Sequence, residues 1–184
     1  MHRNTAELET LLDQILAAPT GTGRLEMIAR RPADGEREVV QKGHLSLEDG
    51  LVGDNWKTRR NANTEDGAAD PQAQVTLMNA RATDAVASTR DRWALCGDQL
   101  YVDLDLSIDN LPAGARLAVG DAVVEISAKP HTGCAKFSQR FGSEALRFVN
   151  VGLGRENRFR GVNTFVVRPG AVAVGDKIMK LDPA

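Results

Sequence analysis

The chain has 184 residues, of which 42% are hydrophobic and 26% are charged, and its formal net charge at pH 7 is −2. This length supports one full-sized hydrophobic core and leaves little room for a second domain. The slightly acidic balance argues against a nucleic-acid binder and against a protein held on a membrane surface by basic residues. With two cysteines, no apolar signal core and no long apolar run, the sequence predicts a cytoplasmic protein without nucleic-acid or membrane partners.

Residues 1–23 are predicted to form an N-terminal amphipathic helix and a linker. Asn4 followed by Glu7 is typical of a helix-capping box. Apolar residues then recur at helical spacing until Pro19, and they are Leu8, Leu11, Leu12, Ile15 and Leu16. This stripe must pack either on the rest of the domain, residues 24–184, or on a second subunit. The oligomeric state is therefore left open, with a dimer as one possibility.

The next segment reads as a hairpin followed by a turn. Residues 25–30 and 38–47 have the composition of strands, and the turn-forming stretch Pro32 to Gly35 separates them. Asp54, in Gly53-Asp54, is expected to do no more than cap a turn. The polar stretch 59–74 lacks periodicity and is predicted to be a mobile segment or a functional lid. Arg59 and Arg60 at its start are expected to be exposed to solvent, with contact to an anion as the alternative.

The middle of the chain contains the clearest strand pattern. Residues 74–78 read as a strand and 79–89 as a helix. Between residues 100 and 108, apolar side chains alternate with others, which predicts a half-buried strand whose second face, with Tyr101, Asp103, Asp105 and Ser107, contacts water. A Gly-Asp turn between short apolar runs occurs twice, in 114–126 and in 170–181.

The last part adds a helix over 143–150, capped by Ser143, a basic loop over 152–161 and a strand over 162–167. Many short strands, glycine and proline turns and only a few helices predict a mainly β fold, a closed or partly closed barrel.

The most informative stretch runs from Lys129 to Gly142. Cys134 directly follows a glycine, and His131, Lys136 and Arg140 lie within a few residues of it. Positive neighbours favour the thiolate over the thiol, so this cysteine is a candidate for a reactive or ligand-binding sulfur. The alternative is a small buried hydrophobic residue. Residues 129–168 carry eight Lys or Arg against two Glu, a net charge of +6 in an acidic chain, which favours a small anionic ligand.

The ordered series of motifs resembles the MOSC family, named after the C-terminal domain of molybdenum-cofactor sulfurases. The resemblance covers roughly residues 24–181 and rests on 125–137 around Cys134, Arg140-Phe141-Gly142, Arg160-Gly161-Val162, Pro169-Gly170 and Val174-Gly175-Asp176. Residues 50–54 and 97–100 are similar to two further elements of the family. Relatives often carry a histidine soon after the Asp of the first element, whereas this chain has Asn55 and Trp56.

The resemblance implies a β-barrel and a cysteine, here Cys134, that carries sulfur as a persulfide or ligates the molybdenum of a pterin cofactor. Charge and proximity make a set of side chains candidates for holding that cofactor: His131, Lys136, Arg140, Arg158 and Arg160. His131 is a candidate for orienting the site or transferring a proton, or it serves only the turn.

Three functions follow as alternatives. The first is a stand-alone protein that binds the cofactor or relays sulfur, in the second case with a cysteine desulfurase as donor, since pyridoxal phosphate is not expected in this chain. The second is a non-catalytic module that binds an anion or a protein partner. The third, by family analogy, is a reductase of N-hydroxylated compounds that depends on an external redox partner.

Overall fold

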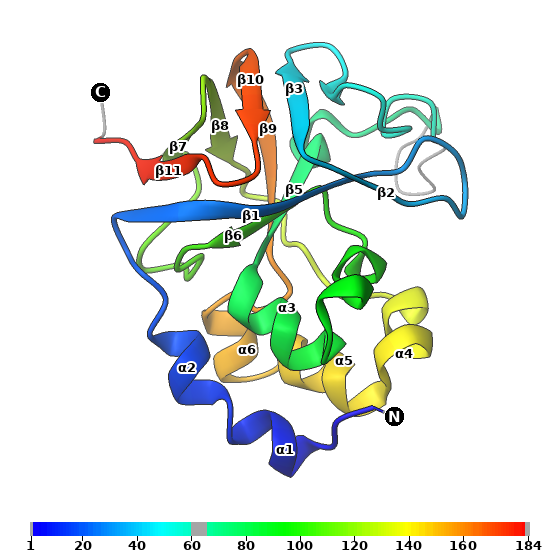
Figure 1. The fold of residues 1–184 in the computed structure, drawn as a ribbon, viewed down its shortest axis with the longest axis vertical. Helices are drawn as coiled ribbons and strands as arrows, with labels where there is room; N and C mark the ends of the chain where they lie inside the picture. Colours follow the sequence, from blue (N-terminus) through cyan, green and yellow to red (C-terminus); the bar gives the residue numbers. More distant parts are fainter. Residues whose placement is uncertain (1, 60–65, 183–184) are drawn as a thin grey trace.

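The computed structural model describes residues 2–59 and 66–182, and within them seven strands close into a barrel (Figure 1). Their order is β11-β7-β8-β9-β5-β6-β1, and β1 pairs again with β11. Neighbours are antiparallel except β5 and β6. The strands are β1 (Thr22–Arg30), β5 (Val75–Asn79), β6 (Leu100–Asp103), β7 (Arg116–Val119), β8 (Ala122–Ile126), β9 (Val162–Arg168) and β11 (Lys177–Lys180).

The long strand β1 closes the barrel because its parts pair with different strands. Its start pairs with β11, its middle with β6, and its end with β2 (Glu38–Val40), which forms the expected hairpin. The register shifts between Leu25 and Met27, a β-bulge of the kind that lets a strand bend around a barrel. Beside the barrel, β10 (Gly170–Ala173), β3 (Lys42–Ser46) and β4 (Gly50–Leu51) form a small antiparallel sheet.

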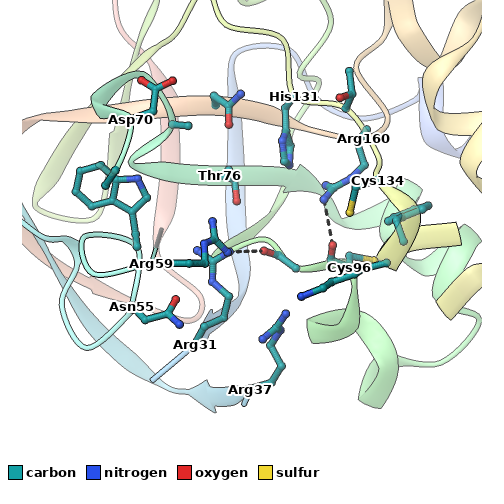
Figure 2. Close-up of a pocket in the computed structure, with 18 of the residues that line it drawn as sticks. Arg31, Arg37, Asn55, Arg59, Asp70, Thr76, Cys96, His131, Cys134 and Arg160 are labelled. Carbon is teal, nitrogen blue, oxygen red and sulfur yellow. Dashed lines mark hydrogen bonds between the residues drawn. The ribbon is translucent and has the colours of Figure 1, made fainter. Parts of the chain in front are cut away.

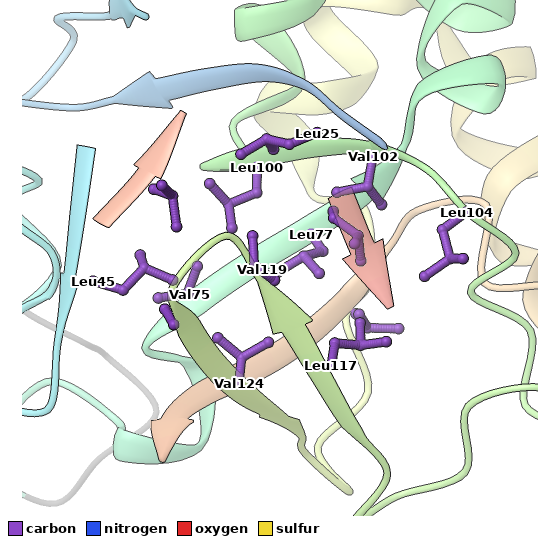
Figure 3. Close-up of a cluster of buried hydrophobic side chains, with 14 of the residues drawn as sticks. Leu25, Leu45, Val75, Leu77, Leu100, Val102, Leu104, Leu117, Val119 and Val124 are labelled. Atoms are coloured by element: carbon purple, nitrogen blue, oxygen red, sulfur yellow. The ribbon is translucent and has the colours of Figure 1, made fainter. Parts of the chain in front are cut away.

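The barrel interior is one apolar cluster, to which each strand contributes alternate side chains (Figure 3). Leu25, Leu77, Leu100, Leu117 and Val124 are fully buried there. Interior side chains fill a small barrel completely, so the space inside the strands is hydrophobic core. A binding site has to lie outside this core.

Helices cover one end of the barrel and form a second apolar cluster with it (Figure 1). They are α1 (Thr5–Glu9), α2 (Leu12–Leu16), α3 (Ala80–Ala87), α4 (Ala135–Phe141), α5 (Ser143–Asn150) and α6 (Leu153–Glu156), with the 3-10 helices η1 (Pro71–Ala73) and η2 (Arg90–Cys96). Among the described residues, no helix has both the length and the apolar character needed to span a bilayer. The mainly β barrel with a few helices that the sequence predicts is therefore confirmed.

The N-terminal helix differs from the prediction. The capping box is present, since Glu7 N–H donates to Asn4 Oδ1 and Asn4 N–H donates to Glu7 Oε2. The single expected helix is wrong, because α1 ends at Glu9. The hydroxyl of the C-cap residue, Thr10, donates to the Glu7 carbonyl and competes with further helical bonds. The apolar stripe packs within this chain, with Leu8 and Ile15 buried among the other helices.

The predicted strand over 100–108 is too long, and its second face is only partly exposed to water, since Asp103 and Asp105 are half-buried. Strand β6 ends at Asp103, because the Asp105 carboxylate accepts hydrogen bonds from the Ser107 N–H and hydroxyl and makes a turn. Tyr101 is fully buried, since the helical layer covers that face. Ile108 is 49% exposed, although the alternation of apolar residues assigns it to the buried face of the predicted strand.

The two Gly-Asp units take different roles. The first is the expected hairpin, β7 and β8, around Gly120-Asp121. The second makes a turn, in which Asp176 Oδ2 accepts from the Ala173 N–H, but β10 then pairs with β3 while β11 pairs with β7 and β1. Helix α3 and strand β9 confirm the helix expected over 79–89 and the strand expected over 162–167. The N-cap residue of α5 is Gly142 and not the expected Ser143. The expected basic loop contains the short helix α6.

Candidate functional site

A cavity of about 450 Å³, here called the cysteine cavity, lies where the cysteine loop, residues 129–134, meets the loops that follow β1 and β4 (Figure 2). Cys134 lines it and is exposed. Five other segments contribute to the lining, with residues that include Arg31, Arg59, Asp70, Cys96 and Asn163. The site therefore stands outside the barrel core, at the junction of the strands with the helical layer.

The cysteine loop is held by hydrogen bonds from both sides. Asn163 Nδ2 donates to the carbonyls of Lys129 and Pro130, each at 3.1 Å, and Gly133 N–H donates to Asn150 Oδ1 at 3.1 Å. A Cβ at Gly133 would lie 2.5 Å from Leu146 Cδ1, so a larger residue there would require the Leu146 side chain to shift. Cys134 then caps the N-terminus of α4 with extended backbone. A constrained backbone of this kind presents the sulfur in one place.

Seven cationic side chains line the cavity and give it a positive character: Arg31, Arg37, Arg59, Lys129, Lys136, Arg140 and Arg160. Two acids line it, Asp34 and Asp70, and the second is paired with Lys129. Burial, and then the charges of Arg140 and Arg31, lower the pKa of Arg37. Burial and the charge of Arg31 likewise lower the pKa of Arg59. Cations that destabilise one another around a cavity favour an anionic occupant.

A buried network of Asp98, Arg160 and His131 stands behind the cysteine. Asp98 Oδ2 accepts from the Arg160 guanidinium at 2.6 Å, and Asp98 Oδ1 lies 2.7 Å from His131 Nε2. The Asp98 side chain is fully buried, and Arg160 also donates to the Cys96 carbonyl at 3.1 Å. Burial by itself raises the pKa of Asp98, but the charges of Arg160 and His131 and their hydrogen bonds outweigh it and bring the pKa to about 2.

This network selects one tautomer of His131. Burial and the neighbouring Arg160 lower the pKa of His131 below its ordinary value, so the ring is neutral at neutral pH. Asp98 is ionised and only accepts hydrogen bonds, so Nε2 carries the ring proton. Nδ1 therefore holds a lone pair on a ring that lines the cavity. It is able to accept a hydrogen bond or a proton from a ligand.

The network predicts a loss of stability in acid. The folded-state pKa values of His131 and Asp98 are both lowered, so their contributions are present above the unfolded values of 6.5 and 3.8 and are lost as the pH falls. We expect the free energy of unfolding to decrease below about pH 6.5, by at most about 1.4 kcal/mol per pH unit for each group. Urea denaturation between pH 8 and 4 measures this slope, and His131→Gln should remove most of it above pH 5. An unchanged slope in that variant would contradict the assignment.

A second ion pair, between Arg31 and Asp54, stabilises the wall of the cavity that the loops after β1 and β4 form. Asp54 accepts from the Arg31 guanidinium through both oxygens, at 2.9 and 2.8 Å, and from the backbone N–H groups of Arg31 and Trp56 at 2.9 Å each. The expectation that Asp54 only caps a turn is wrong. No local pattern indicates that the buried Arg31 reaches it across 23 residues.

The structure brings five of the six predicted site residues together and separates one. Residues His131, Cys134, Lys136, Arg140 and Arg160 line the cysteine cavity. Arg158 does not line it, because its guanidinium turns to the carbonyls of Leu111, at 2.5 Å, and Leu106 and lines another cavity. Of the two arginines expected in solvent, Arg59 is exposed at the cavity, and Arg60 lies outside the described residues.

Sequence reasoning missed Arg31 and Arg37 from the first hairpin and the anchoring role of Asp98. The motif around Gly97-Asp98 was a usable signal for Asp98, whereas nothing in the sequence pointed to the two arginines. Cys96, the other cysteine, is buried, and burial raises the pKa of its thiol well above the ordinary range. Only Cys134 combines exposure with the cationic cavity in the described part of the chain.

These features define a class: a closed barrel of short strands with a cysteine on a loop at the edge of a cationic cavity. The model of the MOSC domain family matches residues 64–179, and the chain belongs to that family. The resemblance inferred from the motifs is thereby confirmed.

Two solved structures show the same fold. The YuaD protein from Bacillus subtilis is similar with a TM-score of 0.63 at 16% identity, over 85% of this chain and 94% of that one. YiiM from Escherichia coli is similar with a TM-score of 0.56 at 19% identity, over 88% and 71%. No curated protein matches the chain.

Proposed function

We propose that the cysteine cavity binds a molybdenum-pterin cofactor and that Cys134 is the protein ligand of the metal. The observation that carries this proposal is the exposed cysteine at a cavity of about 450 Å³ with seven cationic side chains. Sites for small molecules commonly occupy about 300–1,000 Å³. The size and charge of the cavity suit a phosphate-bearing ligand larger than a single inorganic ion.

The polar atoms around the cavity fit a pterin as well as a phosphate. Asn55 Oδ1, an acceptor, and Arg37 Nε, a donor, are buried without a hydrogen-bond partner among the residues that the structure describes, and both residues line the cavity. A pterin ring offers N–H donors and nitrogen and oxygen acceptors that would pair with such groups. Arg31, Arg59 and Arg140 would hold the phosphate, since guanidinium groups suit its geometry.

The ligand chemistry fits a metal that arrives inside a cofactor. Thiolates are soft ligands, and the described residues contain no group of three or more His, Cys, Asp or Glu that could hold a metal ion alone. One cysteine is enough when the cofactor supplies the remaining ligands. When bound, the cofactor supplies a redox centre, while His131 offers Nδ1 as a proton acceptor and Asp98 holds its ring in place.

Replacing Cys134 by Ser tests the metal ligand. In protein purified without oxygen from a host that makes the cofactor, we expect about one molybdenum per chain in the wild type and roughly a tenfold loss or more in Cys134→Ser. Elemental analysis measures the metal, and fluorescence of the released pterin measures the cofactor. Cys96→Ala is the matched control and should keep its molybdenum. Equal molybdenum in Cys134→Ser and the wild type would refute the ligand assignment.

The accessibility of Cys134 also favours a second candidate, a persulfide relay. In this reaction the Cys134 thiolate attacks the terminal sulfur of a donor persulfide, as on a cysteine desulfurase. The donor S–S bond breaks, its electron pair stays on the donor sulfur, and a new S–S bond forms on Cys134. Peptide mass analysis of the same samples separates the candidates, because a relay leaves one extra sulfur atom on the Cys134 peptide and no stoichiometric molybdenum.

A further inference from the structure

A second cavity, of about 540 Å³, lies against the cysteine loop and shares residues 129–132 and Arg160 with the cysteine cavity. Its other walls come from the end of α5, from α6, and from the start of β9. The sequence placed Arg158 with Cys134, but the structure places it here. The loop that carries the cysteine therefore lines two cavities.

The charges around the second cavity are unbalanced. Among the described residues its lining contains no Asp or Glu, and it contains Lys129, Arg155, Arg158 and Arg160. Lys129 pairs with Asp70 and Arg160 with Asp98. Within residues 2–59 and 66–182, neither Arg155 nor Arg158 forms an ion pair with a carboxylate. Two positive charges at a cavity without acidic partners favour an anion there.

Arg158 is held in an unusual conformation that aims its side chain. Its φ is +49°, in the left-handed region that non-glycine residues seldom adopt, and its carbonyl accepts from the Gly161 N–H at 2.7 Å. The guanidinium donates to the carbonyls of Leu111 and Leu106, and burial lowers its pKa. Backbone strain of this kind persists where the surrounding structure enforces it and is often found at binding sites.

One part of the wall of the second cavity is apolar. Val149 and Val162 are buried in it, and Ile108 lines it with 49% of its surface exposed. A ligand that contacts these side chains while its charge meets Arg155 and Arg158 has an apolar body and an oxyanion group. We propose that the second cavity binds small molecules of this class, organic carboxylates or phosphates with an apolar part.

The position of this site gives it a role beside the cysteine cavity. His131 lines both cavities, so a ligand in the second cavity lies next to a residue that also lines the first. Resting on the proposed function, the second cavity is the substrate site of a cofactor bound next to Cys134. Binding itself needs only the residues that line the second cavity.

Phenyl phosphate is a suitable probe because it joins an apolar ring to an oxyanion. Titrated into the full-length ¹⁵N-labelled protein, up to about 10 mM, it should cause saturable shifts of amide signals in 149–162 and at Ile108. Arg155→Ala and Arg158→Gln should each weaken binding roughly tenfold, the usual order for a charge-assisted hydrogen bond. Ile108→Trp, which adds bulk to the lining, should weaken it as well while leaving the charge unchanged.

Arg147→Ala is the matched control, since it removes an exposed arginine of α5 that lines neither cavity, and it should bind as the wild type does. Cys134→Ser should also bind the probe normally, which separates this proposal from the metal-ligand assignment. Shifts centred on Arg37, Arg59 and Lys136, an equal loss in Arg147→Ala, or an absence of saturable shifts would each overturn the proposal.

Discussion

Replacing Asp98 by Asn is expected to lower the free energy of unfolding by about 3–5 kcal/mol, the usual cost of removing one partner from a buried ion pair. The Asp98 side chain is fully buried, and that of Arg160 is 6% exposed. Without the carboxylate, the Arg160 charge stays buried with weaker partners, which are the Cys96 carbonyl, Met78 Sδ and the face of the Phe137 ring. Urea denaturation at pH 7.5 measures the loss.

The control for Asp98 is Asp103→Asn, which breaks the more exposed pair with Arg81 and should cost about 1 kcal/mol or less. A double variant, Asp98→Asn with Arg160→Met, should recover part of the loss, because it removes the unpaired buried charge. If Asp98→Asn and Asp103→Asn had equal effects, the network behind the cysteine would not be the anchor that the structure indicates.

Replacing Gly161 by Ala is expected to destabilise the protein by about 2–5 kcal/mol, since backbone strain and a backbone clash add together. Gly161 has φ +101°, and a Cβ there would lie 2.1 Å from the Leu77 carbonyl oxygen and 3.2 Å from Met78 Cα. These are backbone atoms of β5, the neighbour of β9 in the barrel, so neither moves cheaply. The change should also displace Arg160, the adjacent residue, and so weaken ligand binding in both cavities that Arg160 lines.

Gly175→Ala separates the two causes. Gly175 has a similar φ of +94°, but nothing lies within 4 Å of an added Cβ. This variant should therefore show only the backbone term, about 1–2 kcal/mol. Thermal and urea unfolding of both variants measure the difference, and equal losses would show that the contact with β5 is not limiting.

Features that depend on neighbours in sequence were predictable. The Asn4 capping box, helix α3 after Asn79 and the hairpin around Gly120 follow from local hydrogen bonding and turn preference, and all three are present. The extent of β6 was not predictable, because burial of Tyr101 depends on helices that come from other parts of the chain. An alternation of apolar residues with a period of two shows which residues share a face of a strand, but it does not show what covers the other face.

The candidate site divides in the same way. Cys134, His131, Lys136 and Arg140 are close in sequence and lie together at one cavity. Arg158 and Arg160 are the same residue type in the same short segment, so the sequence does not distinguish their side chains. The positive φ at Arg158 and the glycine after Arg160 nevertheless direct the two guanidinium groups to different partners. A short separation along the chain does not determine a side-chain direction when a turn lies between.

By itself, the sequence determined the family, the barrel class and the cysteine, because motifs, turns and apolar periodicity are local properties of the chain. Only the tertiary structure decided which charges surround that cysteine. Closing the barrel brings Arg31 and Arg37 of the first hairpin to a loop about one hundred residues later, and burial pairs Asp98 with Arg160. Long-range pairing and desolvation depend on the complete fold, so no local pattern encodes them.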